Sequence, residues 1–271
     1  MNEELKFIDS AGEQLFVIEH QPDNPQPTKA YVFLHPFAEE KLWSHRVYVT
    51  TARAFCAQGC LVMRFDFRGH GDSGGEFLNS SLERHNQDID AVISHVKQRY
   101  PEIQSLGLFG LRLGGTLASQ AAARRGDVDE LVLWDPVLSG DRYMQEILRS
   151  NLAAQMAVKG KVEVTRDDLI AQMKAGKPIN VEGYYLTHDY FQELSTLNLQ
   201  ATEFPEGLKC CLVQIVKNPK QPFNKQYEQF FERFAEGSQL QKAQEEPFWK
   251  EIKTFYDRAD NLLDQTLNWL D

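Results

Sequence analysis

Short apolar runs alternate with helical patterns along the first half of the chain, and this alternation constrains the fold more than any other feature. The apolar runs are 30–34, 60–65, 106–109 and 130–134. The helical patterns between and after them are 46–58, 82–100 and 113–125. Continuous apolar runs are typical of strands buried on both faces, and their alternation with helices is typical of a mostly parallel sheet. A hairpin is expected ahead of them, with its turn at Ser10 to Gly12. The sequence therefore predicts an α/β fold with helices on both faces of the sheet.

The alternation stops after residue 136 and resumes near residue 208. The intervening segment has helical patterns and one short β piece, at 142–158, 167–175, 189–194 and 179–186. The later elements are expected at 210–216, 223–235, 239–244 and 259–270. With 271 residues, the chain suffices for one large domain with an insertion. We expect a core made of 1–136 and 208–271 and a helical cap inserted at 137–207.

The third apolar run leads directly into a glycine-rich turn and a helix of small residues. Gly110 and Gly114 frame this turn, and Arg112 is its central residue. Strand, Gly-x-x-x-Gly and helix form the frame of a nucleophile elbow, which lifts its central side chain above the sheet at a helix N-terminus. A working elbow carries Ser, Cys or Asp at that position. A guanidinium remains protonated and has no lone pair for attack, so Arg112 cannot act as a nucleophile.

Several further motifs carry a resemblance to known proteins. The stretch from Arg64 to Ser73 resembles the Asp-x-Arg-Gly-His-Gly-x-Ser loop of serine-aminopeptidase-like α/β hydrolases. A more particular set resembles the type 2 hydrolase-like proteins associated with exosortase A systems, and it comprises 35–40, 110–114, 134–140, 175–177, 181–184 and 246–249. The resemblance implies an α/β-hydrolase fold with an eight-stranded sheet, an elbow arginine, no settled activity and a place beside bacterial exopolysaccharide genes. This chain departs from the pattern at His35, where that family often has proline.

The other members of a Ser-His-Asp triad are missing from their usual places. In this fold the order along the chain is nucleophile, acid, histidine, and the histidine follows the last strand. None of the seven histidines lies between residues 189 and 271. After the run 210–216 no carboxylate occurs before Glu228, which is inside the next predicted helix. Asp135, at the end of the preceding strand, is an alternative acid position. With all three roles affected, the sequence predicts that triad chemistry is absent.

An arginine at the elbow suits a negative partner. The backbone N–H groups of Leu113 and Phe37 occupy the places of oxyanion-hole donors, and the helix N-terminus adds positive potential. One interpretation is a pocket for an anionic ligand. The other is an internal salt bridge from Arg112 to Glu39, Glu40 or Asp135 that fills a former active site. The residues proposed to shape the site are Arg112, Leu113, Phe37, Glu39, Glu40 and Asp135.

Two functions are compatible with these observations. The favoured one is a non-catalytic relative of α/β hydrolases that binds an anionic small molecule or acyl group. The alternative is an ester or thioester hydrolase, or an acyltransferase, that uses rearranged residues, for which Ser73, Asp135 and His35 are the polar candidates. His45 and His70 border the expected pocket mouth, and we assign them no catalytic role.

The composition of the chain limits which molecules it is expected to bind and where it is expected to be located. The net charge of −10 disfavours nucleic acid, whose phosphates repel an acidic chain. No run of about 18 apolar residues is present, so we expect no membrane insertion. The N-terminus lacks a secretory signal, and the four cysteines are expected to be buried, reduced thiols of a cytoplasmic protein. The cysteines lack zinc-site spacing, and we expect neither a metal nor a cofactor. A protein partner or a homo-oligomer remains compatible with the sequence.

Overall fold

An eight-stranded sheet lies at the centre of the computed structural model, which describes residues 1–159, 164–250 and 256–270. The strand order is β1-β2-β4-β3-β5-β6-β9-β10. The strands are β1 (Asn2–Ser10), β2 (Glu13–Gln21), β3 (Lys29–Leu34), β4 (Leu61–Phe65), β5 (Ser105–Leu111), β6 (Glu130–Trp134), β9 (Lys209–Val216) and β10 (Gln239–Gln244). Strands β1 and β2 form the antiparallel hairpin, β2 pairs antiparallel with β4, and all other neighbours are parallel. The predicted eight-stranded, mostly parallel sheet is confirmed.

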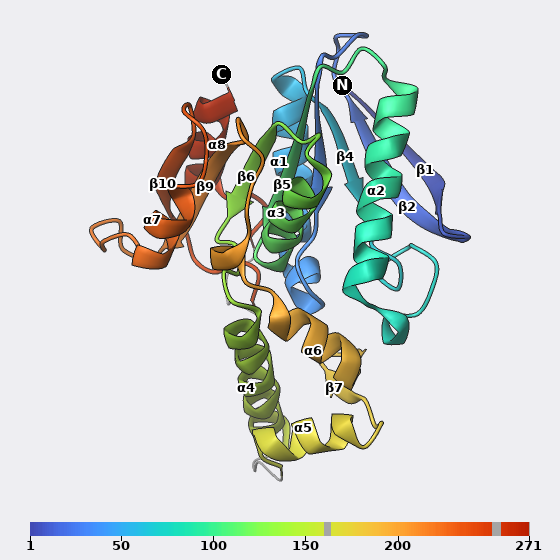
Figure 1. Cartoon of the computed structure of the whole chain (residues 1–271), viewed down its shortest axis with the longest axis vertical. Helices are drawn as coiled ribbons and strands as arrows, with labels where there is room; N and C mark the ends of the chain where they lie inside the picture. Colours follow the sequence, from blue (N-terminus) through green and yellow to red (C-terminus); the bar gives the residue numbers. More distant parts are fainter. Residues whose placement is uncertain (160–163, 251–255, 271) are drawn as a thin grey trace.

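Helices cover both faces of this sheet (Figure 1). The helices of the core are α1 (Glu39–Ala57), α2 (Leu82–Arg99), α3 (Leu113–Arg125), α7 (Lys225–Phe231) and α8 (Asp260–Leu270), with a 3-10 turn η1 (Phe77–Asn79). Alternate residues of β3 show how the layers form. Val32 packs in the cluster with Ile89 of α2 and Ala118 of α3, whereas Phe33 packs with Phe55 of α1. Because successive strand residues face opposite sides, α2 and α3 cover one face and α1 and α8 the other.

The segment predicted as a cap projects from one end of the sheet (Figure 1). It contains α4 (Gly140–Lys159), α5 (Arg166–Lys174), β7 (Ile179–Val181), β8 (Tyr184–Leu186), α6 (His188–Thr196) and a 3-10 turn η2 (Leu199–Ala201). Its two ends meet in a narrow connection, where Ser139 and Asn198 form an isolated bridge and Gly140 N donates to Leu197 O at 2.7 Å. A Cβ at Gly140 would lie 1.8 Å from Leu194 O, so this close approach requires glycine. The division into core and cap domains stays a prediction.

Two predicted helix boundaries are corrected. Helix α1 begins at Glu39 and not at Arg46, because Ala38 turns the chain with a φ of 47° and Glu40 N closes the first turn on Phe37 O. Helix α7 spans Lys225–Phe231, which is shorter than the predicted 223–235. It begins after Asn224, whose side chain accepts a hydrogen bond from Gln226 N.

The four cysteines are buried and form no disulfide, as predicted. Burial raises the pKa of all four thiols, for example to about 11 for Cys60. None of the described helices combines the length and apolarity that a bilayer span would need.

Candidate functional site

The turn between β5 and α3 has the predicted elbow geometry. Strand β5 ends at Leu111, α3 begins at Leu113, and Arg112 between them has a φ of 52° and a ψ of −122°. The two glycines permit this turn, because a Cβ at Gly110 would lie 2.3 Å from the Gly114 carbonyl carbon and one at Gly114 would lie 2.2 Å from Leu34 O. Arg112 therefore has the strained backbone of a nucleophile position, and its side chain is only 12% exposed.

Three carboxylates surround the Arg112 guanidinium. Glu146 Oε2 lies 3.1 Å from Nη2, Glu40 Oε1 lies 3.5 Å from Nε, and Asp135 Oδ2 lies 3.7 Å from Nη1. Each nitrogen of the fork therefore has its own negative partner. These partners come from three elements far apart in the sequence: Glu40 from α1, Asp135 from the end of β6, and Glu146 from cap helix α4.

Two aromatic rings enclose the cation. The guanidinium carbon lies 5.2 Å from the centroid of Tyr143 and 5.5 Å from that of Trp249, which are cation–π distances. Trp249 follows the last strand, where a catalytic histidine would stand in a working enzyme. Trp249 therefore occupies this corner next to Arg112.

The carboxylates are held by further polar contacts. Tyr143 Oη donates to Glu40 Oε2 at 2.7 Å, and Tyr227 Oη donates to Asp135 Oδ1 at 3.1 Å. Lys250 Nζ lies 2.6 Å from Glu146 Oε1. The group thus contains two cations and three carboxylates, and Arg112 lies at its centre. We call these five charged residues, Glu40, Arg112, Asp135, Glu146 and Lys250, the elbow ion cluster.

Burial and the neighbouring charges shift the pKa values of the residues in this cluster in opposite directions. Burial raises the pKa of Glu40 and of Asp135, although the nearby charge of Arg112 lowers both. Burial lowers the pKa of Arg112, but the charges of Glu40 and Asp135 outweigh it and leave the pKa above its ordinary value. The guanidinium therefore stays charged, and the two buried carboxylates depend on it for their own charge.

The predicted partners of Arg112 are partly corrected. Glu40 and Asp135 reach it, but Glu39 forms no ion pair with it among the described residues, and burial followed by the charge of Glu182 raises the pKa of Glu39. The sequence analysis missed Glu146, because its contact with Arg112 depends on how a cap helix packs against the elbow. One available signal was the spacing of Arg142, Glu146 and Arg149, which places three charges on one face of α4.

The predicted oxyanion donors have no protein acceptor in the described part of the chain. Among the described residues, the backbone N–H groups of Phe37 and Leu113 have no hydrogen-bond acceptor. Both residues are only 2% exposed. Two buried donors beside an elbow are an arrangement that can receive an anionic oxygen.

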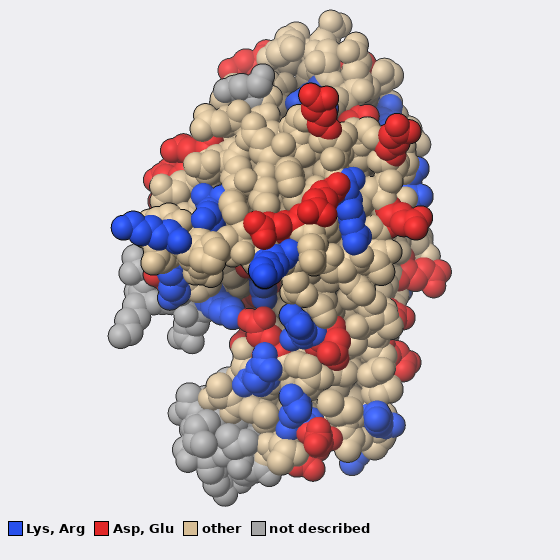
Figure 2. Space-filling model, turned by 60° about the vertical axis from the view of Figure 1, so that its left-hand side comes forward, with Lys and Arg blue, Asp and Glu red and all other residues tan. Residues whose placement is uncertain are grey.

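A pocket of about 310 Å³ lies beside the cluster, between the elbow and α4. Its lining residues include Arg112, Ser139, Arg142, Glu146, Arg149 and Tyr227. We call this cavity the cap pocket. Of the residues predicted to bind a ligand, only Arg112 is part of its described lining. Figure 2 shows the surface hollowed where the cap segment joins the body, with basic and acidic side chains mixed there.

The other polar candidates are engaged elsewhere. His35 is buried, with Nδ1 2.7 Å from Pro36 O and Nε2 accepting from Phe67 N at 3.2 Å. Ser73 Oγ accepts from Phe16 N at 2.8 Å and donates to Asp66 O. His70 does not border a pocket mouth as predicted, because it is 3% exposed and packs against Phe77. Among the described residues, no three His, Cys, Asp or Glu side chains are grouped to hold a metal ion.

The sheet and its elbow define an α/β hydrolase by fold. Est1E from Butyrivibrio proteoclasticus, solved with bound ferulic acid, is similar over 98% of this chain and 99% of its own, with a TM-score of 0.67 and 17% identity. The family model described as serine aminopeptidase, S33, matches residues 25–189, more than half of the chain. The chain therefore belongs to this family.

Proteins related by sequence match shorter stretches of the chain than the family model does. The monoacylglycerol lipase of Mycolicibacterium smegmatis is 26% identical over 146 residues, which are 54% of this chain and 50% of the lipase. An uncharacterised 31.7 kDa protein of Escherichia coli, from the traX-finO intergenic region, is 30% identical over 127 residues, which are 46% of this chain and 44% of that protein. The chain thus spans about half the length, or less, of these relatives.

Proposed function

We propose that this α/β-hydrolase-family protein is non-catalytic and binds an anionic small molecule or acyl group in the cap pocket. The observation that carries the proposal is Arg112 at the elbow within the elbow ion cluster. The position that would hold a nucleophile is occupied by a group that cannot attack a carbonyl, and its three nitrogens already face carboxylates.

The positive charge available to a ligand comes from the rim of the cap pocket. Arg142 and Arg149 are exposed on α4, seven residues apart and therefore on one face of the helix. Arg142 Nη1 contacts the neutral Gln226 Oε1 at 3.2 Å. Among the described residues neither arginine has a carboxylate within ion-pair distance. An anionic head group at this rim would meet two unpaired guanidinium groups, while Arg112 keeps its own partners.

The rest of the pocket suits a short acyl group. Val137 and Leu138 form an apolar part of the wall, and Pro136 continues it. These features support a ligand with a negative head and a small apolar body.

Titration calorimetry with octanoate and with inorganic phosphate tests this proposal. We expect saturable binding of at least one of these probes, and a loss of tenfold or more in affinity for the double variant Arg142→Ala/Arg149→Ala. Arg166→Ala is the matched control, because Arg166 is an exposed cap arginine outside the pocket lining. Equal binding by the double variant, or no binding of either probe by the wild type, would refute it.

The alternative, an esterase, thioesterase or acyltransferase with rearranged residues, receives no support from the geometry. It would need Ser73, Asp135 and His35 to act together. His35 and Ser73 have their polar atoms engaged by backbone groups, and Asp135 faces Arg112 and Tyr227. Each would have to leave these contacts before it could take part in catalysis.

The place of the protein in the cell is part of the same proposal. The motif resemblance to exosortase-associated hydrolase-like proteins supports a cytoplasmic role linked to exopolysaccharide systems, with a protein partner or a second copy as a compatible addition. Deletion of the gene in its own bacterium should alter exopolysaccharide output, and unchanged output would remove this link without affecting the binding proposal.

A further inference from the structure

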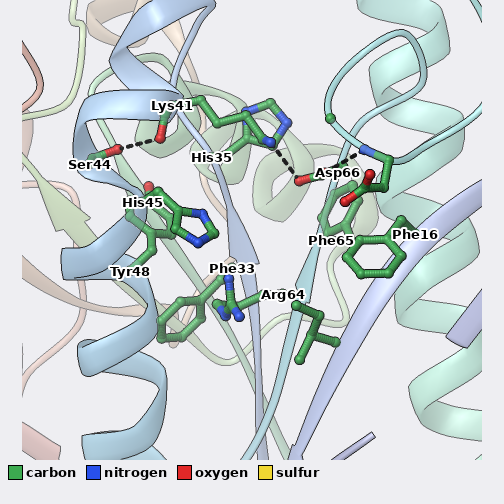
Figure 3. A pocket seen from close by; sticks show the side chains of 13 residues that line it. Phe16, Phe33, His35, Lys41, Ser44, His45, Tyr48, Arg64, Phe65 and Asp66 are labelled. Carbon is green, nitrogen blue, oxygen red and sulfur yellow. Dashed lines mark hydrogen bonds and ion pairs between the residues drawn. The ribbon is translucent and has the colours of Figure 1, made fainter. Parts of the chain in front are cut away.

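A second pocket lies on the other side of β3, away from the elbow. Arg64 is the arginine in its lining. The pocket has a volume of about 130 Å³ and lies between α1, β2 and the end of β4. The residues of its lining that matter here are Phe16, Phe33, Lys41, His45, Arg64 and Asp66, and Figure 3 shows them around the cavity. No residue of this lining belongs to the cap pocket.

Arg64 stands where an apolar side chain would be expected. It lies on β4, and strand alternation places it on the same face as Val62, which packs with Val47 and Phe55 of α1. Burial lowers the pKa of Arg64 to about 10, which reflects the cost of holding a guanidinium in this position. A cation on a buried sheet face is costly unless an anion compensates it.

Arg64 has no anion in direct contact in the described part of the chain, although the charges of Asp66 and Glu3 raise its pKa from farther away. Arg64 Nε donates to Nε2 of His20 at 2.9 Å, and His20 is a neutral partner because burial lowers its pKa to about 4. Among the described residues no carboxylate lies within ion-pair distance of Arg64. The nearest acid along the strand, Asp66, is already paired with Lys41 at 2.9 Å. The two terminal amino groups of Arg64 are therefore available to the cavity.

The surroundings of Arg64 define what could bind there. Figure 3 shows the guanidinium directed toward the rings of Phe33 and His45, with Phe16 on the opposite side of the cavity. His45 makes no hydrogen bond among the described residues, and burial followed by the charge of Arg64 lowers its pKa. A neutral imidazole beside a guanidinium can add a second hydrogen bond to an anionic oxygen.

We propose that this pocket binds a small organic monocarboxylate with a flat apolar body. The carboxylate would take the forked amino groups of Arg64, and the body would lie between the aromatic rings of Phe16 and Phe33. The cavity is close in size to engineered apolar cavities of about 150 Å³ that accept benzene. A single unpaired cation favours a monoanion, since Asp66 and the exposed Asp72 at the pocket would repel a second negative charge. The inference is independent of the function proposed for the cap pocket.

Benzoate is the probe that tests it, with benzyl alcohol as a neutral compound of similar shape. Calorimetry on the whole protein should give saturable binding of one benzoate, and binding of benzyl alcohol at least tenfold weaker. Arg64→Gln should weaken benzoate binding at least tenfold, and Arg64→Lys should restore only part, because it keeps the charge and loses the fork. The variant Arg142→Ala/Arg149→Ala should bind benzoate within about twofold of the wild type, since it alters only the other pocket.

A measurement on the unaltered protein covers the case in which Arg64→Gln does not fold. The imidazole resonances of His45 should shift on addition of benzoate, and the pKa of His45 should rise, because a bound carboxylate offsets the charge of Arg64. No saturable benzoate binding, equal binding of benzyl alcohol, an unchanged affinity in a folded Arg64→Gln protein, or a His45 resonance that does not respond would each overturn the proposal. So would an equal affinity for inorganic phosphate in the Arg142→Ala/Arg149→Ala variant, in which the cap pocket no longer binds anions.

Discussion

Arg112→Ala should destabilise the protein strongly and in a way that depends on pH. The substitution leaves Glu40, Asp135 and Glu146 facing one another around an empty space. Removing one partner from a buried ion pair costs about 3–5 kcal/mol. Glu146 is 33% exposed and keeps Lys250, so we expect the lower end, about 3 kcal/mol. For a protein of this size that corresponds to a fall in Tm of roughly 6–12 °C.

The pH dependence follows from the raised pKa values of Glu40 and Asp135. A carboxyl group whose folded-state pKa exceeds its unfolded value keeps a proton that the unfolded chain has lost. Stability therefore falls as pH rises from the unfolded pKa, near 4, through the folded one. Without Arg112 these folded pKa values rise further, so the loss should be larger at pH 8 than at pH 5.

Urea unfolding at both pH values measures this effect. The matched control is Arg124→Ala, which removes a 41% exposed arginine 2.8 Å from Asp90 and should cost less than about 1 kcal/mol at either pH. If Arg112→Ala were as stable as the wild type, or lost the same free energy at pH 5 and pH 8, the reasoning about the elbow ion cluster would be wrong.

Three further predictions concern the elbow and the buried histidines. Arg112→Ser should hydrolyse p-nitrophenyl acetate no faster than Arg112→Ala, because Trp249 fills the place of the missing base; a rate well above that control would contradict this. Gly110→Ala should yield little folded protein in a thermal-unfolding assay, since its Cβ would lie 2.3 Å from the Gly114 carbonyl carbon, and a wild-type Tm would count against the elbow geometry. Burial lowers the pKa of His70 to about 4, so its folded pKa lies below the unfolded value and the stability it contributes is lost as pH falls from about 6.5 toward 4; an NMR titration near pH 6.5 for His70 would disprove it.

The sheet and the elbow were predictable because both depend on local sequence. Continuous apolar runs marked the buried strands, and helix α3 and strand β6 have the predicted bounds. Gly110 and Gly114 indicated a tight turn. In the structure both positions require glycine, because neighbouring backbone atoms leave no room for a Cβ. Arg112 could then be placed without knowledge of any long-range contact.

The partners of Arg112 were less predictable, because they depend on how separate elements pack. Glu40 and Asp135 lie on loops or helix starts next to any elbow of this fold, and they were named in advance. Glu146 and Tyr143 reach the elbow only through the angle at which α4 leaves the sheet. Arg64 was noted as part of a motif, but its lack of a carboxylate partner becomes visible only when its neighbours are placed.

Labelling with a fluorophosphonate probe, read out by intact-protein mass, tests the central proposal most directly. A functional serine hydrolase is modified stoichiometrically at its activated serine, whereas Arg112 offers no nucleophile at the elbow. The account predicts an unchanged mass for the folded protein under conditions that fully label an active serine hydrolase. Stoichiometric labelling of any serine, Ser73 included, would contradict it.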